Sequence, residues 1–366
     1  MLARCLKGPI FSGSYVATDV EFLLKPLEIA TTDVETKERL IQSGERHYSE
    51  MLSPELAPGP AYMSAYERAL AANADRLARD VKALALALAL RPVSASGHAI
   101  VSLARAGTPI GVLLARELRR LGCPAFHYSI SIVRGRGVDL NAIRYILQNH
   151  RRTDLSFVDG WTGKGAIARE LRGDRGPKAL GVDPYLVVVA DPAGQADLAA
   201  TGDDYVIPSG ILNGIVSGLV SRSVLNEAIG DADFHGCVVL DHLRPLDVSR
   251  GFVEAIDAKV RANAPLQPAI WPKAIRAARR LACEKLVGSV IDIAGVSDIN
   301  RVKPGIAEAT RAVLRRVPDR LFVSDPADSR LAHLLELCRE RGLEPETLAE
   351  MHGYRAVAVI KSLGSE

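Results

Sequence analysis

One stretch of the chain combines the residue types that bind phosphate groups. The apolar run Ser156-Phe157-Val158 ends at Asp159, passes through Gly160-Trp161-Thr162-Gly163-Lys164-Gly165, and continues as a helix-forming segment. This order predicts a strand, a loop and a helix. Backbone N–H groups at a helix start have no helical partners and point together, and glycine lets an anion approach them. The loop therefore predicts a phosphate cradle with the Asp159 carboxylate beside it.

A similar strand, loop and helix precedes this one. Residues 98–103 form an apolar run that predicts a buried strand, and Arg105-Ala106-Gly107-Thr108 is the turn before a helix that Thr108-Pro109 begins. Arg105 offers a planar, permanently charged fork for phosphate oxygens, and Gly107 lets the backbone approach. A capped helix start with a surface arginine explains this loop equally well when it is considered alone.

A basic loop lies between these two motifs. Arg134-Gly135-Arg136-Gly137 follows a predicted strand at 125–133 and precedes a predicted helix at 140–150. Two arginines between glycines suit a lid that brings positive charge over a ligand and expels water when it closes. A solvated, hairpin-like loop is the alternative interpretation.

Length and composition restrict the class of protein. A chain of 366 residues with 48% hydrophobic and 24% charged residues and a net charge of +3 predicts a globular protein of about two domains without a strongly basic surface. Its five cysteines form no CxxC pair, so we expect neither a zinc site nor a disulfide framework, and we expect a reducing, cytoplasmic setting. No apolar run is long enough to span a membrane, and the sequence leaves the oligomeric state, a homo-oligomer included, open.

Strands alternate with helices along most of the chain, which predicts an α/β fold with a mainly parallel sheet. We expect an N-terminal helical hood at 1–92, a central domain at 93–268, a Pro-rich linker and a small C-terminal α/β domain at 275–366. Ligands of such sheets bind at the carboxyl ends of the strands. The further candidates to line that edge are Asp191, Ser209, Asn213, Asp241 and His242, each of which also suits a turn or cap.

The Asp159 loop resembles that of the type I phosphoribosyltransferases, and the Arg105 loop resembles their pyrophosphate loop. A P-loop is excluded because Gly160 stands only three residues before Gly163, and Lys164 is followed by glycine. The resemblance implies that the acid holds the ribose hydroxyls of phosphoribosyl pyrophosphate (PRPP) and that the loop amides hold its 5′-phosphate. The chain departs from the family pattern because Gly160 replaces a second acid, and the loop to Thr162 is about one residue short.

The C-terminal residues resemble the kink-turn-binding ribosomal proteins and Pelota over 302–314, 320–325 and 354–361. That resemblance implies an RNA-binding domain. The residues that it implies in RNA or phosphate contact are Lys303, Gly305, Glu308, Arg311 and Arg315. Ala307 stands where the family has an asparagine, which removes a base-edge contact. A small α/β domain with merely solvated charges is the alternative.

Together the two halves resemble the PRTase-Pelota family of bacterial tellurium-resistance (Ter) stress operons, whose members also carry the label cysteine protease StiP. The first label implies a phosphoribosyltransferase that uses PRPP, Mg²⁺ and a nucleobase-like acceptor to make a nucleotide or ribonucleoside-like metabolite. Asp159 would position the ribose and Mg²⁺, and Arg105, Arg134 and Arg136 would hold the leaving pyrophosphate. This transferase is our main prediction from the sequence.

Two other functions stay open. A cysteine protease needs a thiol beside a base, and Cys237 with His235 or His242 is the one local Cys/His grouping in the sequence. Cys237 also opens an apolar run, where a buried and inert cysteine is usual. Because the second acid is missing, a module that binds a phosphoribosyl ligand without turnover is the other alternative.

Overall fold

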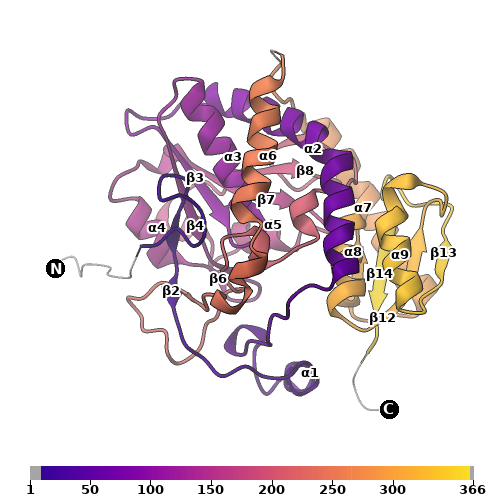
Figure 1. Cartoon of the computed structure of the whole chain (residues 1–366). Coiled ribbons are helices and arrows are strands. Elements are labelled where there is room, and N and C mark those ends of the chain that lie inside the picture. The colour runs from indigo at the N-terminus through magenta and orange to yellow at the C-terminus, as the bar shows by residue number, and fades with distance from the viewer. Residues whose placement is uncertain (1–9, 265, 363–366) are drawn as a thin grey trace.

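The computed structural model describes residues 10–264 and 266–362, apart from the side chains of residues 42 and 315. A large α/β part holds a six-stranded sheet, and a smaller α/β part at the C-terminus packs beside it (Figure 1). The predicted fold class, a mainly parallel sheet with a small C-terminal α/β domain, is confirmed. The predicted domain boundaries at 92, 268 and 275 stay predictions.

The large sheet is parallel throughout. Its strands, in order across the sheet, are β1 (Glu21–Leu23), β4 (Ala125–Ile130), β3 (His98–Leu103), β7 (Leu155–Trp161), β8 (Leu186–Ala190) and β9 (Leu198–Thr201). The central strands β3 and β8 are buried at every residue, as an apolar run with helices on both faces requires. Strands β3 and β7 are neighbours, so the Arg105 and Asp159 loops leave the same edge of the sheet.

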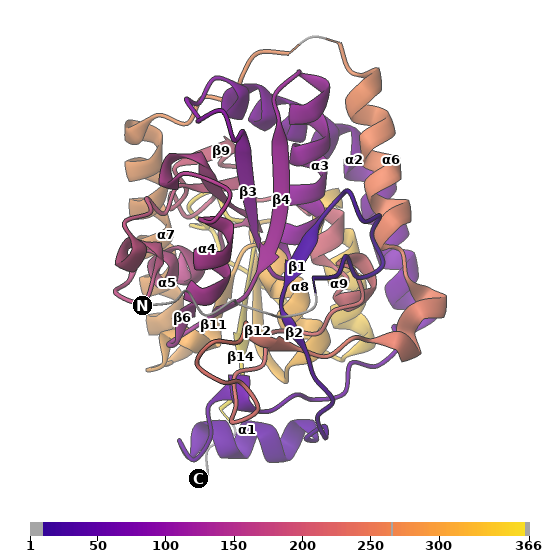
Figure 2. The same cartoon turned by 90° about the vertical axis from the view of Figure 1, so that its left-hand side faces the viewer.

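Helices cover both faces of this sheet (Figure 2). One face carries α2 (Pro60–Ala89), α3 (Gly107–Arg120) and α6 (Ser249–Ala262), and the other carries α4 (Leu140–Ile146) and α5 (Ala166–Arg172). The long helix α2 begins at Pro60 with Gly59 as its N-cap. Proline suits the first helical position because it has the required φ and needs no N–H partner. None of the described helices is long and apolar enough to cross a lipid bilayer.

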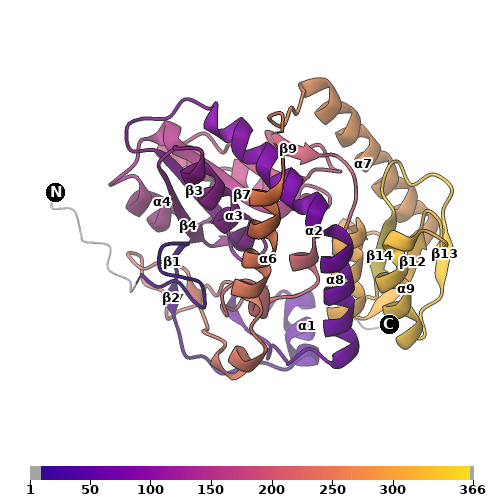
Figure 3. The same ribbon diagram turned by 45° about the horizontal axis from the view of Figure 1, so that its top comes forward.

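The C-terminal part is a four-stranded mixed sheet with helices packed on it (Figure 3). The strand order is β11 (Val302–Pro304), β14 (Ala356–Ile360), β12 (Pro318–Val323) and β13 (Pro345–Thr347). Its helices are α7 (Lys273–Ala294), which leads in from the large part, α8 (Ile306–Arg315) and α9 (Ala332–Glu340).

Short elements surround the carboxyl edge of the large sheet. Helix α1 (Val34–Gln42) lies in the N-terminal segment, and β2 (Lys25–Pro26) pairs in parallel with β10 (Gly236–Cys237). The basic loop after β4 is a hairpin of β5 (Ile132–Val133) and β6 (Gly137–Val138). The expected strand at 125–133 is therefore interrupted after β4.

A buried carboxylate fastens the two parts together. Asp204 follows β9, and its side chain accepts hydrogen bonds from the backbone N–H of Ile306 at 2.9 and 3.1 Å and of Arg355 at 2.9 Å. Ile306 is the first residue of α8, so Asp204 satisfies a free helical donor from another part of the chain. Burial raises the pKa of this carboxyl to about 6, so it is mostly ionised above neutral pH.

We expect Asp204→Ala to lower the free energy of unfolding by about 2–3 kcal/mol, because it leaves two buried N–H groups without an acceptor. Urea unfolding at pH 8 measures this. Asp174→Ala, at an exposed position, is the matched control and should stay within about 0.5 kcal/mol of the unsubstituted protein. Equal losses in the two variants would show that Asp204 does not hold the parts together.

Candidate functional site

Asp159 lies near the end of β7, as the sequence predicted. Its Oδ1 accepts a hydrogen bond from the N–H of Gly160 at 2.8 Å. Loss of solvent around the carboxyl is the main cause of a pKa raised to about 7; the Gly160 N–H and Arg311 lower the pKa, and Glu308 raises it by a smaller amount. A group that is half protonated at neutral pH is a weak ligand for sugar hydroxyls or a cation.

The loop after Asp159 is bonded to the protein itself. The N–H of Thr162 donates to the carbonyl of Ala190 at 3.0 Å. The Thr162 hydroxyl donates to the buried carboxylate of Asp191 and accepts from the N–H of Ala193 at 3.3 Å. Asp191 is thus a structural anchor of the loop, and the first amide of the predicted cradle is not free for an anion.

The C-terminal domain covers the rest of this loop. A Cβ added to Gly163 would lie 2.9 Å from Cγ of Glu308, so helix α8 packs directly on the loop. The Tyr354 hydroxyl donates to the Gly163 carbonyl at 2.9 Å, and Lys164 Nζ donates to the Val302 carbonyl at 2.8 Å. Burial lowers the pKa of Lys164 to about 8. Side chains of the second domain therefore occupy the space expected for a sugar phosphate.

The Arg105 loop keeps its glycine for a packing reason. A Cβ on Gly107 would lie 2.2 Å from the Val158 carbonyl, so α3 can begin this close to β7 only with glycine there. Ala106 is the N-cap of α3, whereas Thr108 was expected to cap it. The Thr108 hydroxyl instead bonds the Ser129 hydroxyl at 2.8 Å on the neighbouring strand.

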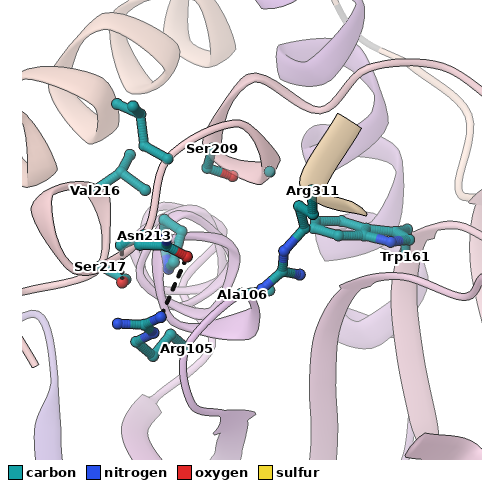
Figure 4. A pocket seen from close by; sticks show the side chains of 11 residues that line it. Arg105, Ala106, Trp161, Ser209, Asn213, Val216, Ser217 and Arg311 are labelled. Carbon is teal, nitrogen blue, oxygen red and sulfur yellow. Dashed lines mark hydrogen bonds between the residues drawn. The ribbon is translucent and has the colours of Figure 1, made fainter. Parts of the chain in front are cut away.

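Arg105 itself is held by other protein groups. Its Nη1 donates to Glu55 Oε2 at 2.5 Å and to the Val220 carbonyl at 3.2 Å, and its Nη2 donates to Asn213 Oδ1 at 3.2 Å. The side chain lines a small pocket (Figure 4). The other polar or aromatic residues of this pocket are Trp161, Ser209, Asn213, Ser217 and Arg311.

The basic hairpin is fastened rather than free. The N–H of Arg134 donates to the Tyr48 hydroxyl at 2.8 Å, and Arg136 Nη2 donates to Glu50 Oε1 at 2.5 Å. Two glycine N–H groups of the hairpin donate to Glu170 at 2.8 and 2.7 Å. The alternative interpretation, a hairpin, thus describes the geometry, and neither guanidinium lines the Arg105 pocket.

The carboxylates at this edge do not fit the Mg²⁺ that the resemblance implied. A divalent magnesium site usually has one or two ionised carboxylates beside an open coordination sphere. Asp159 has Gly160 in place of the second acid and is half protonated near pH 7. Among the described residues no group of three His, Cys, Asp or Glu side chains is placed to hold a metal ion. We derive no reaction step through a metal.

Of the residues implied in RNA contact, Gly305, Glu308 and Arg311 lie just before or within α8 and beside the large part of the chain. Gly305 has φ +94°, which suits glycine, and leads into the helix beside Asp204. The Arg311 guanidinium lies 5.5 Å from the centre of the Trp161 ring. Lys303 is in β11, where burial lowers its pKa, and Arg315 ends the helix. Gly305 and Arg311 therefore lie at the contact between the two domains.

Burial raises the pKa of the Cys237, Cys283 and Cys338 thiols, so these three cysteines are not activated in this conformation. Cys237 in β10 is fully buried, and burial raises the pKa of its thiol to about 12. Its two nearest histidines in sequence have other partners, since His235 Nδ1 bonds the Ser131 hydroxyl at 2.8 Å and His242 Nε2 bonds the Glu55 carbonyl at 3.0 Å. Cys5 lies outside the described residues.

Comparison with known proteins gives the family. A family model described as "Tellurite-like stress resistance cysteine protease StiP" matches residues 13–257. A curated protein named "Cysteine protease StiP" from Acinetobacter baylyi is 40% identical over 370 residues, which covers 97% of this chain and 95% of that protein. The chain belongs to the StiP family. The predicted membership in the PRTase-Pelota family, also labelled StiP, is thereby confirmed.

A second family model supports the C-terminal prediction. The model described as "PELOTA RNA binding domain" matches residues 282–362, so this StiP family member carries a domain of the Pelota type. The solved structures that were matched are too dissimilar to support an argument about the function of this chain. Hypoxanthine phosphoribosyltransferase of Trypanosoma cruzi is 14% identical with a TM-score of 0.24, covering 52% of this chain and 85% of that chain. The enzyme titled HGPRT-ase of Leishmania tarentolae is 14% identical with a TM-score of 0.22, covering 38% and 68%.

The main functional prediction from the sequence was wrong. StiP family members are named for cysteine proteolysis, a hydrolase activity, whereas the sequence predicted a phosphoribosyltransferase with PRPP and a nucleobase as substrates. The physical reason is visible in the loop, whose first amide is bonded internally and whose outer side is packed against α8. A loop sequence can resemble a phosphate cradle and still be a packing surface.

Sequence reasoning missed how several residues combine at this edge. It did not pair Arg105 with Glu55 or place Trp161 against Arg311, because these contacts join residues 50 and 150 positions apart. Ser209 and Asn213 were named as lining candidates from their position after a strand, and both line the Arg105 pocket. The turn residues Pro208 and Gly210 around Ser209 were the available signal.

We expect Asp159→Asn to change how stability depends on pH. A carboxyl whose pKa is raised by folding binds its proton more tightly in the folded state, so the unsubstituted protein loses stability as pH rises from about 4 to about 7. Asparagine removes that loss. From pH 5 to pH 8 the free energy of unfolding of the variant should rise by about 1–2 kcal/mol relative to that of the unsubstituted protein. This figure allows for solvent screening of the carboxyl. Urea unfolding at the two pH values measures it.

Asp183→Asn, at an exposed position before β8, is the control and should show no such change. If Asp159→Asn and the unsubstituted protein differed in free energy of unfolding by the same amount at pH 5 and at pH 8, the raised pKa would be contradicted.

Proposed function

We propose that this chain is a stress-resistance hydrolase that cleaves peptide bonds through a cysteine thiol. One observation carries the proposal: the curated relative named "Cysteine protease StiP" is 40% identical and aligns with 97% of the chain. The family model of the same description supports it over residues 13–257. The unpaired state of the four described cysteines fits a thiol function in a reducing, cytoplasmic compartment.

Cys237 is the described cysteine that we assign to this activity, because His235 lies two positions before it on the same extended segment. A thiol attacks a peptide carbonyl only as thiolate, and a pKa of about 12 keeps Cys237 protonated at neutral pH. The structure described above is therefore the resting form. Activation requires β10 to separate from β2, so that water and the imidazole reach the sulfur.

Hydrolysis of fluorescein-labelled casein with and without iodoacetamide tests the proposal. We expect Cys237→Ser to lower the rate at least 100-fold, while Cys123→Ser, at a partly exposed cysteine just after the C-terminal end of α3, keeps it. If the Cys237→Ser variant still cleaved casein and iodoacetamide still inhibited it, another cysteine would be the nucleophile. Casein left uncleaved by the full chain, also under conditions in which β10 separates from β2, would refute the hydrolase activity.

A second function rests on a different observation. The Pelota-type domain is present at 282–362, and we propose that the chain binds single-stranded RNA through the side of α8 that carries Arg311. Lys303 and Lys164 lie close enough to interact electrostatically, which adds positive charge beside this helix. Phosphate contacts by such groups release counterions, so the affinity should fall with salt.

The RNA proposal predicts a charge-reversal effect. Arg311→Glu should weaken binding of a 12-nucleotide single-stranded RNA at least tenfold at 100 mM salt, as measured by fluorescence anisotropy. Arg339→Glu, an exposed arginine on α9 of the same domain, makes the same change in net charge and should have less than a twofold effect. Equal weakening in both variants would indicate non-specific attraction only.

A further inference from the structure

Three cationic side chains gather where helix α1 meets the C-terminal end of α8. Lys37 is on α1, Arg316 follows α8 directly, and Arg222 comes from the chain between β9 and β10. Arg316 forms an ion pair with Glu38 of α1, so the two helices are in contact at this point (Figure 3). This cationic cluster therefore joins the N-terminal segment, the large part and the Pelota-type domain.

The cationic cluster has more hydrogen-bond donors than acceptors. Lys37 Nζ makes no hydrogen bond or ion pair within the described residues. Arg222 Nη2 donates to the Met51 carbonyl, whereas its Nη1 is buried without a partner in the part of the chain that the structure describes. A charged donor that has lost water without gaining an acceptor is unfavourable, so an anion bound here would stabilise the folded chain.

The carboxylates around the cationic cluster leave it positive. Glu38 lies near all three cations, and it is already paired with Arg316. Arg105 adds a positive charge beside Arg222, and its own partner Glu55 cancels that charge. Three cations with one carboxylate leave two uncompensated positive charges.

The repulsion among these cations affects their protonation. Burial, followed by the charges of Arg222 and Arg316, lowers the pKa of Lys37 to about 8. Burial and then the charge of Arg105 lower the pKa of Arg222 to about 10. A bound anion would oppose both effects, because it favours the charged forms.

Two aromatic rings lie beside the cationic cluster. The Arg222 guanidinium is 5.4 Å from the centre of the Tyr48 ring, and the centres of the His47 and Tyr48 rings are 4.6 Å apart. Cations that contact phosphates, together with aromatic rings on which bases stack, are typical of surfaces that bind single-stranded nucleic acid. The aromatic rings therefore favour RNA over a small inorganic anion.

The cationic cluster is connected to the side of α8 that carries Arg311. Lys303 of β11 interacts electrostatically with Arg316 and with Glu308. Glu308 in turn forms an ion pair with Arg311 at 3.8 Å. Charged groups thus continue from Arg311 to Lys37, across the contact between the two domains.

We propose that a single-stranded RNA bound to α8 continues across the domain contact, where Lys37, Arg222 and Arg316 hold its backbone phosphates. The inference rests on the RNA-binding function proposed above and adds a second contact on the N-terminal segment. Each internal phosphodiester carries one negative charge, so two uncompensated positive charges suit two phosphates of the strand. RNA bound in this way holds the two domains together.

Fluorescence anisotropy of a 12-nucleotide single-stranded RNA on the full chain tests this contact. We expect Lys37→Gln to weaken binding about fivefold at 100 mM salt and to reduce the salt dependence of log affinity by about 0.7, the loss of one phosphate contact. Lys37→Arg keeps the charge and should bind as the unsubstituted protein does. Arg39→Gln, at an exposed arginine of the same helix, makes the same change in net charge and should have less than a twofold effect.

The thermal midpoint of the RNA-free chain separates a binding role of Lys37 from a structural one. Lys37 is repelled by two neighbouring cations, so Lys37→Gln should leave the midpoint unchanged or raise it. A loss of RNA affinity at an undiminished midpoint cannot come from unfolding. A midpoint lowered by several degrees would show that Lys37 stabilises the fold and would overturn its assignment to RNA.

The remaining outcomes separate this contact from the RNA function itself. Binding that Arg311→Glu weakens, but that is equal in Lys37→Gln and Arg39→Gln, would refute the contact on α1 and keep the RNA function. Absence of RNA binding in every variant would refute both. Inorganic phosphate is also titrated by thermal shift. If its stabilising effect required Lys37 while the RNA affinity did not, the cationic cluster would be a site for a small anion and RNA would be refuted as its ligand.

Discussion

The contact between the loop after β7 and the start of α8 is the interaction on which the functional edge of this molecule depends. Gly163 admits Glu308 at a distance that no larger residue would allow, and Tyr354 and Lys164 bond across the same boundary. Asp204 adds the buried acceptor that holds the first N–H of α8. Because these contacts join two domains, any ligand at the edge must either fit between them or separate them.

The same contact explains why a phosphate-binding motif proved misleading. The sequence from Asp159 to Gly165 has the glycines and the small polar residues that a cradle needs, and local sequence alone does not distinguish an anion from a neighbouring domain as their partner. In the folded chain the Thr162 amide bonds Ala190, and α8 packs against Gly163. The family to which the chain belongs is named for a thiol chemistry and not for sugar transfer.

The two proposed functions make different demands on this architecture. Hydrolysis through Cys237 needs a buried strand pair to open, since an apolar environment keeps the thiol protonated. RNA binding through Arg311 needs no such opening, because this side chain is already partly exposed beside Trp161.

The sequence by itself determined the alternation of strands and helices, the parallel sheet and the small C-terminal domain, because apolar runs and turn residues act over short distances. It also placed Arg105 and Asp159 at the carboxyl ends of strands, as the structure has them. Only the tertiary structure decided what those residues touch. The pairs Arg105–Glu55, Trp161–Arg311 and Gly163–Glu308 join distant segments, and hydrophobic periodicity carries no information about which distant side chains meet.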